Sequence, residues 1–108
     1  LHIPQDNIKL LLKDWSKAIE CTVSSRVLVD GSEIATCIRQ KPFAEDMSWD
    51  SGWLFLADGD EDNDECRYEY CDLNTICNYS PDVMQYLDFP YDTRLVRKED
   101  GKLYVDEE

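Results

Sequence analysis

The sequence predicts an α+β fold, in which a mainly antiparallel sheet forms a single domain and helices pack on one side of it. Short alternating or apolar runs, typical of strands, outnumber the helical segments. The pairs Asp30-Gly31 and Asp100-Gly101 are predicted to form two-residue hairpin turns. A chain of 108 residues, of which 43% are hydrophobic, is long enough for one domain with a modest core.

The first segment, residues 4–19, is predicted to form an amphipathic helix. Asp6 is a suitable N-cap, and apolar side chains recur at helical spacing while lysines fall elsewhere. The apolar positions are Ile8, Leu11, Leu12, Trp15 and Ile19. We interpret this stripe as core packing, with docking into a partner's groove as the alternative. Residues 1–20 would then be an N-terminal helix that forms one compact unit with a domain over residues 21–108.

A hairpin and a central strand are predicted next. Residues 21–29 alternate and contain three valines, and residues 33–39 have the pattern of a returning strand after an Asp30-Gly31 turn. Residues 40–51 have the composition of a loop. The apolar run of residues 52–57 predicts a central strand, and the acidic residues 58–65 predict a loop after it.

The C-terminal half predicts a strand, two helical segments and a last hairpin. Residues 68–71 have strand character, and either Asp72 or Asn74 can cap a short helical turn. Ser80-Pro81-Asp82 is a strong helix start, and Pro90 ends that helix. The apolar side of this helix consists of Val83, Met84, Tyr86 and Leu87. Residues 93–98 and 102–105 are predicted to pair around Asp100-Gly101.

The negative charge is concentrated in the middle of the chain. The net charge is -13, from 24 acidic and 11 basic residues. Residues 42–93 hold 14 of the carboxylates, 10 of the 12 aromatic residues and one basic residue, Arg67. A field of this sign repels nucleic acid and anionic membranes and attracts cationic partners. We therefore expect a basic protein partner, and neither nucleic acid nor a membrane.

The acidic run has a partial resemblance to a calcium loop. Asp58, Asp60 and Asp62 stand at positions 1, 3 and 5 of such a loop, and Glu69 falls at position 12. Position 6 is Asn63, where glycine normally makes the turn, and the preceding run is a strand pattern instead of the entering helix. We therefore expect no specific metal site and no cofactor, with a calcium-binding domain as the weakest alternative.

Catalytic equipment is sparse. His2 is the only histidine, which removes the usual serine- and cysteine-based machinery. Carboxylates are abundant, but no pair stands in an apolar setting that would separate the two pKa values. A phosphate-binding glycine loop is missing as well. We expect no enzymatic activity and no catalytic residues.

The five cysteines have the character of buried thiols. They are Cys21, Cys37, Cys66, Cys71 and Cys77. Their number is odd, and no pair has the C-x-x-C spacing of zinc or redox motifs. We interpret them as reduced packing residues, which favours a reducing compartment and a cytoplasmic protein.

A partner-binding surface is the remaining functional interpretation. Carboxylates would capture a basic partner and neighbouring aromatic side chains would anchor it. The candidate residues are Asp58, Asp60, Glu61, Asp62, Asp64, Glu65, Trp49, Tyr68, Tyr70 and Asn74. A solvated loop is the alternative for the acidic run, and a helix cap is the preferred role of Asn74. Neutralising Asp60, Glu61, Asp62 and Asp64 together is expected to slow association without harming the fold, because self-repulsion falls.

An ordered set of motifs extends this interpretation. "DSGWLFLADGDEDNDE" at residues 50–65 is followed by "DLNTICNYSPD" at 72–82, "LDFP" at 87–90 and the closing hairpin. Over residues 21–105 this order resembles the immunity-protein-33-like domain family. The resemblance implies a bacterial protein that neutralises a toxin of a polymorphic toxin system, and it implies no catalytic residues.

Two functional hypotheses follow. The first is a non-enzymatic immunity protein that binds a cognate basic toxin, such as a nuclease, through an acidic, aromatic-rich surface. The second is a general protein-interaction or regulatory module that has no toxin partner.

Overall fold

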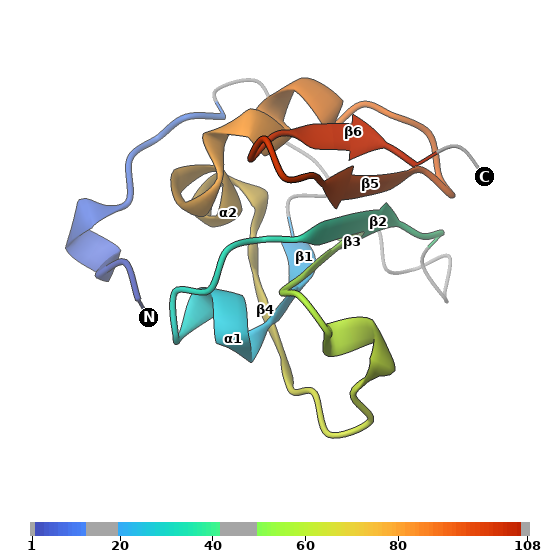
Figure 1. Cartoon of the computed structure of the whole chain (residues 1–108). Helices are drawn as coiled ribbons and strands as arrows, with labels where there is room; N and C mark the ends of the chain where they lie inside the picture. The colour runs from blue at the N-terminus through green and yellow to red at the C-terminus, as the bar shows by residue number, and fades with distance from the viewer. Residues whose placement is uncertain (1, 13–19, 42–49, 107–108) are drawn as a thin grey trace.

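The computed structural model describes residues 2–12, 20–41 and 50–106, and these form a six-stranded mixed sheet with short helices (Figure 1). The strands lie in the order β4-β1-β3-β2-β5-β6. Their bounds are Glu20–Ser24 for β1, Thr36–Arg39 for β2, Asp50–Leu56 for β3, Tyr68–Asp72 for β4, Arg94–Arg97 for β5 and Leu103–Val105 for β6. β1 and β3 are parallel and the other neighbouring pairs are antiparallel. The predicted α+β class is confirmed.

The core lies on one face of this sheet. Val23, Phe55, Cys37 and Leu95 are partners in register across β1, β3, β2 and β5, and all four are fully buried. The helical segments are α1 (Ser25–Leu28), α2 (Leu73–Tyr79) and the 3-10 helix η3 (Pro81–Tyr86). They add Val27, Leu28, Leu73, Ile76, Cys77 and Val83 to the same cluster. The sheet and the helices therefore share one core, as a small domain requires.

The prediction of an N-terminal helix is wrong for the residues that the structure describes. Residues 4–12 contain a single 3-10 turn, η1 (Gln5–Asn7), and then run as extended chain, while residues 13–19 lie outside the described residues. The backbone bonds of this segment go to the body of the protein: Lys9 N–H donates to the Asn78 side chain, and Leu11 and Leu12 N–H groups donate to Asn74. Because these side chains replace the helical i→i−4 partners, the apolar spacing alone did not decide the structure.

The prediction of a hairpin over residues 21–39 is also wrong. The strand predicted at 21–29 ends at Ser24, whose side chain accepts a hydrogen bond from Arg26 N–H and caps α1. Gly31, with φ of +79°, follows α1 and donates its N–H to Val27 O, so it ends a helix and does not form a hairpin turn. β2 pairs with β3 and β5, and β1 pairs with β3 and β4.

The later strands and helical segments lie where the sequence predicts them. β3 is central, β4 follows the acidic loop, and β5 and β6 form the last hairpin. The Asp72 side chain caps α2 by accepting the Thr75 N–H at 2.7 Å, so the cap is Asp72 and not Asn74. Pro81 begins η3, which is a 3-10 helix instead of an α-helix, and within it Met84 is exposed.

Candidate functional site

The D-S-G-W motif at residues 50–53 shapes the start of β3. The Asp50 carboxylate accepts the Gly52 N–H at 2.8 Å, and the Ser51 hydroxyl accepts the Trp53 N–H at 3.2 Å. Gly52 has φ of +86°, and a Cβ there would lie 2.1 Å from the carbonyl oxygen of Gln40. The motif therefore specifies a tight backbone crossing that needs glycine.

Arg39 joins this motif to the L-D-F-P motif at residues 87–90. Its guanidinium donates to Ser51 O at 3.1 Å, to Leu87 O at 3.2 Å and to Phe89 O at 2.7 Å. It also lies 4.9 Å from the ring centroid of Tyr91, a cation–π distance. Both motifs thus organise the fold. Arg39 is not among the residues predicted from the sequence, although a charged residue that closes an apolar strand run is a signal for such a role.

The acidic loop contains a buried carboxylate. Asp60 opens the 3-10 helix η2 (Asp60–Asp62) and is only 1% exposed. One of its oxygens lies 3.0 Å from the Arg26 guanidinium, and the other accepts the Ala57 N–H at 2.7 Å. Burial alone would raise the pKa of Asp60, but hydrogen bonds from Ser24, Ala57 and Arg26 outweigh it and the pKa is lowered. Asp60 is therefore ionised and takes no part in an exposed surface.

Glu61 is also engaged within the chain. Its carboxylate forms a two-pronged pair with Arg94 of β5, at 2.7 and 2.5 Å. These hydrogen bonds lower the pKa of Glu61, and they raise that of Arg94, which also contacts Asp106 at 3.2 Å. Asp60 therefore attaches the loop to α1, and Glu61 attaches it to β5.

The exposed acidic surface is smaller than the sequence suggested. Glu61 is exposed but paired with Arg94. The other exposed carboxylates predicted for the site are Asp58, Asp62, Asp64 and Glu65. They precede β4, where Tyr68 is 47% and Tyr70 is 68% exposed and Glu69 is exposed between them. We call these seven residues the acidic edge. The calcium-loop geometry is not formed, because Asp60 faces Arg26, and the described residues contain no cluster of three potential metal ligands.

The remaining candidates lie elsewhere. Asn74 accepts the N–H groups of Leu11 and Leu12 at 2.7 and 3.0 Å and donates to Lys9 O at 2.9 Å, so its amide holds the N-terminal segment. Trp49 lies outside the described residues. Trp53 and Phe55 are buried, and their rings stack with centroids 6.0 Å apart.

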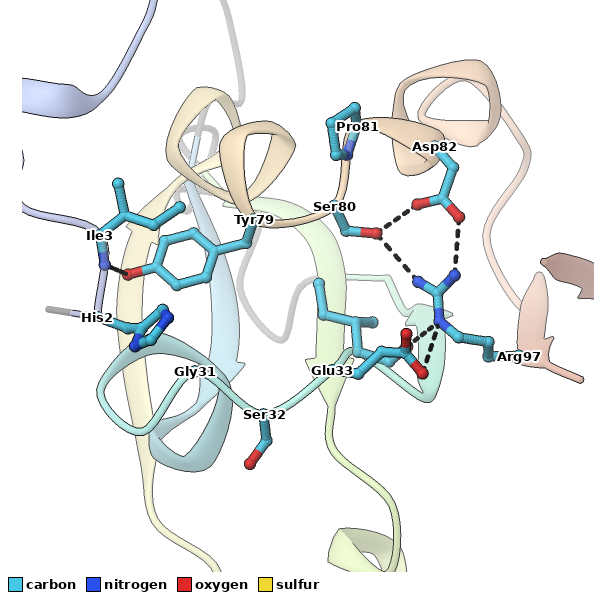
Figure 2. Close-up of a pocket in the computed structure, with 11 residues that line it drawn as sticks. His2, Ile3, Gly31, Ser32, Glu33, Tyr79, Ser80, Pro81, Asp82 and Arg97 are labelled. Carbon is cyan, nitrogen blue, oxygen red and sulfur yellow. Dashed lines mark hydrogen bonds and ion pairs between the residues drawn. The ribbon is translucent and has the colours of Figure 1, made fainter. Parts of the chain in front are cut away.

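A pocket of about 680 Å³ lies on another part of the molecule, between the N-terminal residues, the loop after α1 and the start of η3 (Figure 2). Arg97 is its main charged group, but its guanidinium already donates to Asp82 at 2.8 Å, to Ser80 at 3.0 Å and to Ile34 O at 2.6 Å. Tyr79 is similarly occupied, since its hydroxyl donates to Leu28 O and accepts the Ile3 N–H. The pocket therefore presents satisfied polar groups that position loops.

All five cysteines are free thiols. Cys21 and Cys71 are cross-strand partners with their sulfurs 3.9 Å apart, and Cys37 and Cys77 are buried in the core. Burial raises the pKa of Cys37 to about 12 and that of Cys77 to about 12. Cys21, Cys37 and Cys77 pack as small apolar groups, as the sequence predicted, whereas Cys66 and Cys71 are only partly buried.

Fold and surface together define a small α+β domain with an anchored acidic loop beside an exposed edge strand. The comparison with protein families is specific: residues 21–107 match the model of the immunity protein Imm33 domain. The chain belongs to this family of immunity proteins. No curated protein and no solved structure is significantly similar to it. Within the described part of the chain, no helix is both long and apolar enough to span a bilayer.

Proposed function

We propose that this protein binds and neutralises a cognate basic toxin through the acidic edge, acting by occlusion and without catalysis. The family supports an immunity role. The surface supports the sign of the partner's charge, because the six exposed carboxylates of residues 58–69, five of them in the acidic edge, have a single basic neighbour in that stretch, Arg67. Carboxylates of this kind steer a cationic protein and can cover a phosphate-binding site, which suits a toxin that is a nuclease.

Anchoring of the loop strengthens this proposal. Asp60 and Glu61 fix η2 to Arg26 and Arg94. The backbone at the neighbouring Asp62 and Asp64 is therefore restrained before a partner binds. Restraint before binding lowers the entropy lost on association. The exposed Tyr68 and Tyr70 add the amphipathic aromatic contacts that are common at interface centres. The proposed site of action is the cytoplasm, where a toxin of this kind would be met, with no part played by nucleic acid or a membrane.

The first test is a rescue experiment. The toxin domain encoded beside this gene is expressed with and without the protein, and survival of the cells is expected only with it. Purified protein should also form a stoichiometric complex with an inactivated form of that toxin. Survival without complex formation, or a complex without survival, would contradict neutralisation by binding; a complex with another cellular protein alone would favour a regulatory module.

A second test addresses the charge. Changing Asp58, Asp62, Asp64 and Glu65 to Asn or Gln should slow association by about tenfold or more at low salt and flatten its dependence on salt. A matched control changes four exposed acids elsewhere, Asp6, Asp30, Asp88 and Glu99, and so alters the net charge equally. Equal slowing in both variants would leave only a net-charge effect and would overturn the acidic edge as the capture surface.

A further inference from the structure

Cys21 and Cys71 form a pair of thiols between β1 and β4. They are directly opposed residues of the antiparallel β1–β4 pairing, and their sulfurs lie 3.9 Å apart. The Cys21 thiol also donates to the carbonyl oxygen of Cys71 at 3.4 Å. Opposed residues of an antiparallel pair have Cα atoms about 4.5–5.5 Å apart, and a disulfide joins Cα atoms about 4.4–6.8 Å apart. The backbone therefore already has the spacing that a bridge between these two residues needs.

The two thiols differ in accessibility, which sets the order in which they can react. Cys71 is partly exposed, whereas Cys21 is 1% exposed. Burial raises the pKa of Cys21 well above its usual value and so disfavours its thiolate, which is the reactive form. Cys66 is the other partly exposed thiol, but its sulfur lies beside the Ser24 hydroxyl, at 3.7 Å. Cys71 is therefore the thiol of this pair that meets a reagent from solvent, and Cys21 is placed to attack it afterwards.

We infer that Cys21 and Cys71 close into a reversible cross-strand disulfide when the protein meets a low-molecular-weight disulfide such as oxidised glutathione. The Cys71 thiolate attacks one sulfur of the reagent, which breaks the S–S bond of the reagent and leaves a mixed disulfide on Cys71. Cys21 then attacks the Cys71 sulfur and expels the second half of the reagent. The protons of both cysteines end on the two released thiols, so the protein is oxidised by two electrons and the reagent is reduced by two.

The bridge fixes β4 to β1 on the core side of the sheet. Cys21 belongs to the buried core and Cys71 packs against it. Because successive side chains of a strand point to opposite faces, Tyr68 and Tyr70 of the acidic edge lie on the face opposite to Cys71, and the bridge does not cover their rings. The dithiol is the resting form in a reducing compartment, and the bridge forms when that compartment becomes oxidising. An oxidised cell thus keeps β4, with its part of the acidic edge, attached to the sheet.

Disulfide mapping tests the inference on the purified protein, without a toxin. The folded, reduced protein is incubated with oxidised glutathione, the remaining thiols are alkylated, and a non-reduced digest is examined by mass spectrometry. The expected product is a pair of peptides linked through Cys21 and Cys71, which separate on reduction. A mixed disulfide that persists on Cys71, an unreacted Cys71, or a bridge to another cysteine would overturn the inference.

Thermal unfolding of two serine variants provides the matched control. The bridge joins residues 50 positions apart and so restricts the unfolded chain, and treatment with oxidised glutathione should raise the melting temperature by about 5 °C or more. Cys71→Ser removes the thiol that reacts first and should abolish this rise, whereas Cys66→Ser removes the other partly exposed thiol and should preserve it. Each variant is compared with its own untreated sample, which separates the bridge from any change in basal stability. A rise that survives Cys71→Ser, or one that disappears with Cys66→Ser, would contradict the bridge.

Discussion

The Asp60 carboxylate lies 3.0 Å from the Arg26 guanidinium, so the buried negative charge of the acidic loop has its counterion on α1. Asp60 is fully buried, whereas the Arg26 side chain is half exposed. The pair therefore links the loop that follows β3 to α1. The loop stabilises the fold as well as contributing to the surface.

This pair predicts unequal effects within the loop. Asp60→Asn should lower the free energy of unfolding by about 1–3 kcal/mol, because it removes charge-assisted hydrogen bonds to a buried group. Asp62→Asn, at an exposed position of the same turn, should change it by less than about 0.5 kcal/mol. Urea denaturation of both variants measures the difference, and equal values would contradict the anchoring role. The expectation that neutralising Asp60 with its neighbours spares the fold is thus withdrawn.

Acid should destabilise the protein through the same groups. The pKa of Asp60, Glu61 and Asp82 is lowered in the folded chain. A carboxyl with a lowered pKa stabilises the fold above its unfolded pKa, and this stabilisation is lost as the pH falls through the folded value. The unfolding free energy should therefore be level near pH 7 and fall below about pH 5. Asp60→Asn should show a shallower fall; a parallel curve would exclude Asp60 as a contributor.

Asn74 is predicted to hold the N-terminal segment. Asn74→Ala removes the acceptor of the Leu11 and Leu12 amides, so their exchange protection should fall by about tenfold or more. Asp72→Ala is the contrasting change, because it removes the cap of α2 and should cost about 1 kcal/mol of global stability. Unchanged exchange at Leu11 and Leu12 in the Asn74 variant would show that these bonds do not persist in solution.

Two glycines with the same backbone conformation should respond differently to alanine. Gly52 and Gly59 have φ of +86° and +84°, but a Cβ at Gly52 meets the Gln40 carbonyl at 2.1 Å, whereas at Gly59 nothing lies within 4 Å. Gly59→Ala should cost about 1–2 kcal/mol from backbone strain alone. Gly52→Ala adds the steric clash and should cost more than about 3 kcal/mol or prevent folding. Thermal unfolding compares them, and similar melting temperatures would contradict the tight crossing.

Thiol accessibility should separate the cysteines into two groups. Cys66 and Cys71 are partly exposed and should react with a thiol reagent in the native protein. Cys21, Cys37 and Cys77 are buried and should react only after unfolding, since the thiolate is disfavoured by the raised pKa of each. Mass spectrometry of the labelled native protein should therefore show two modified residues, and rapid labelling of Cys37 would contradict its burial in the core.

Elements governed by neighbours in the chain were predictable. The β5–β6 hairpin turns on Asp100-Gly101, the capping carboxylate of α2 lies three residues from the N–H that it accepts, and Pro81 begins η3. Such signals act over a few residues and are readable from a single sequence. The hairpin predicted at Asp30-Gly31 is wrong because a glycine with positive φ suits a helix end as well as a hairpin turn.

Features set by distant partners were not predictable in this way. The Leu11 and Leu12 spacing favours a helix, but Asn74, more than 60 residues away, holds their amides in an extended segment. The roles of Asp60 and Glu61 depend on Arg26 and Arg94, more than 30 residues away on either side. Sequence composition located the acidic loop, while only the packed chain separates its anchored carboxylates from its exposed ones.

The strand order also governs when the protein can fold during its synthesis. β1 lies between β3 and β4, both of which follow it in the chain, so no early hairpin shelters Val23. Closing such distant contacts is slower than closing local ones. A nascent chain therefore leaves the ribosome with β1 unpaired until residues 50–72 have emerged. A newly synthesised copy can therefore protect a cell only after translation has passed β4. A chain cut short before β3 leaves β1 unpaired and prone to aggregation.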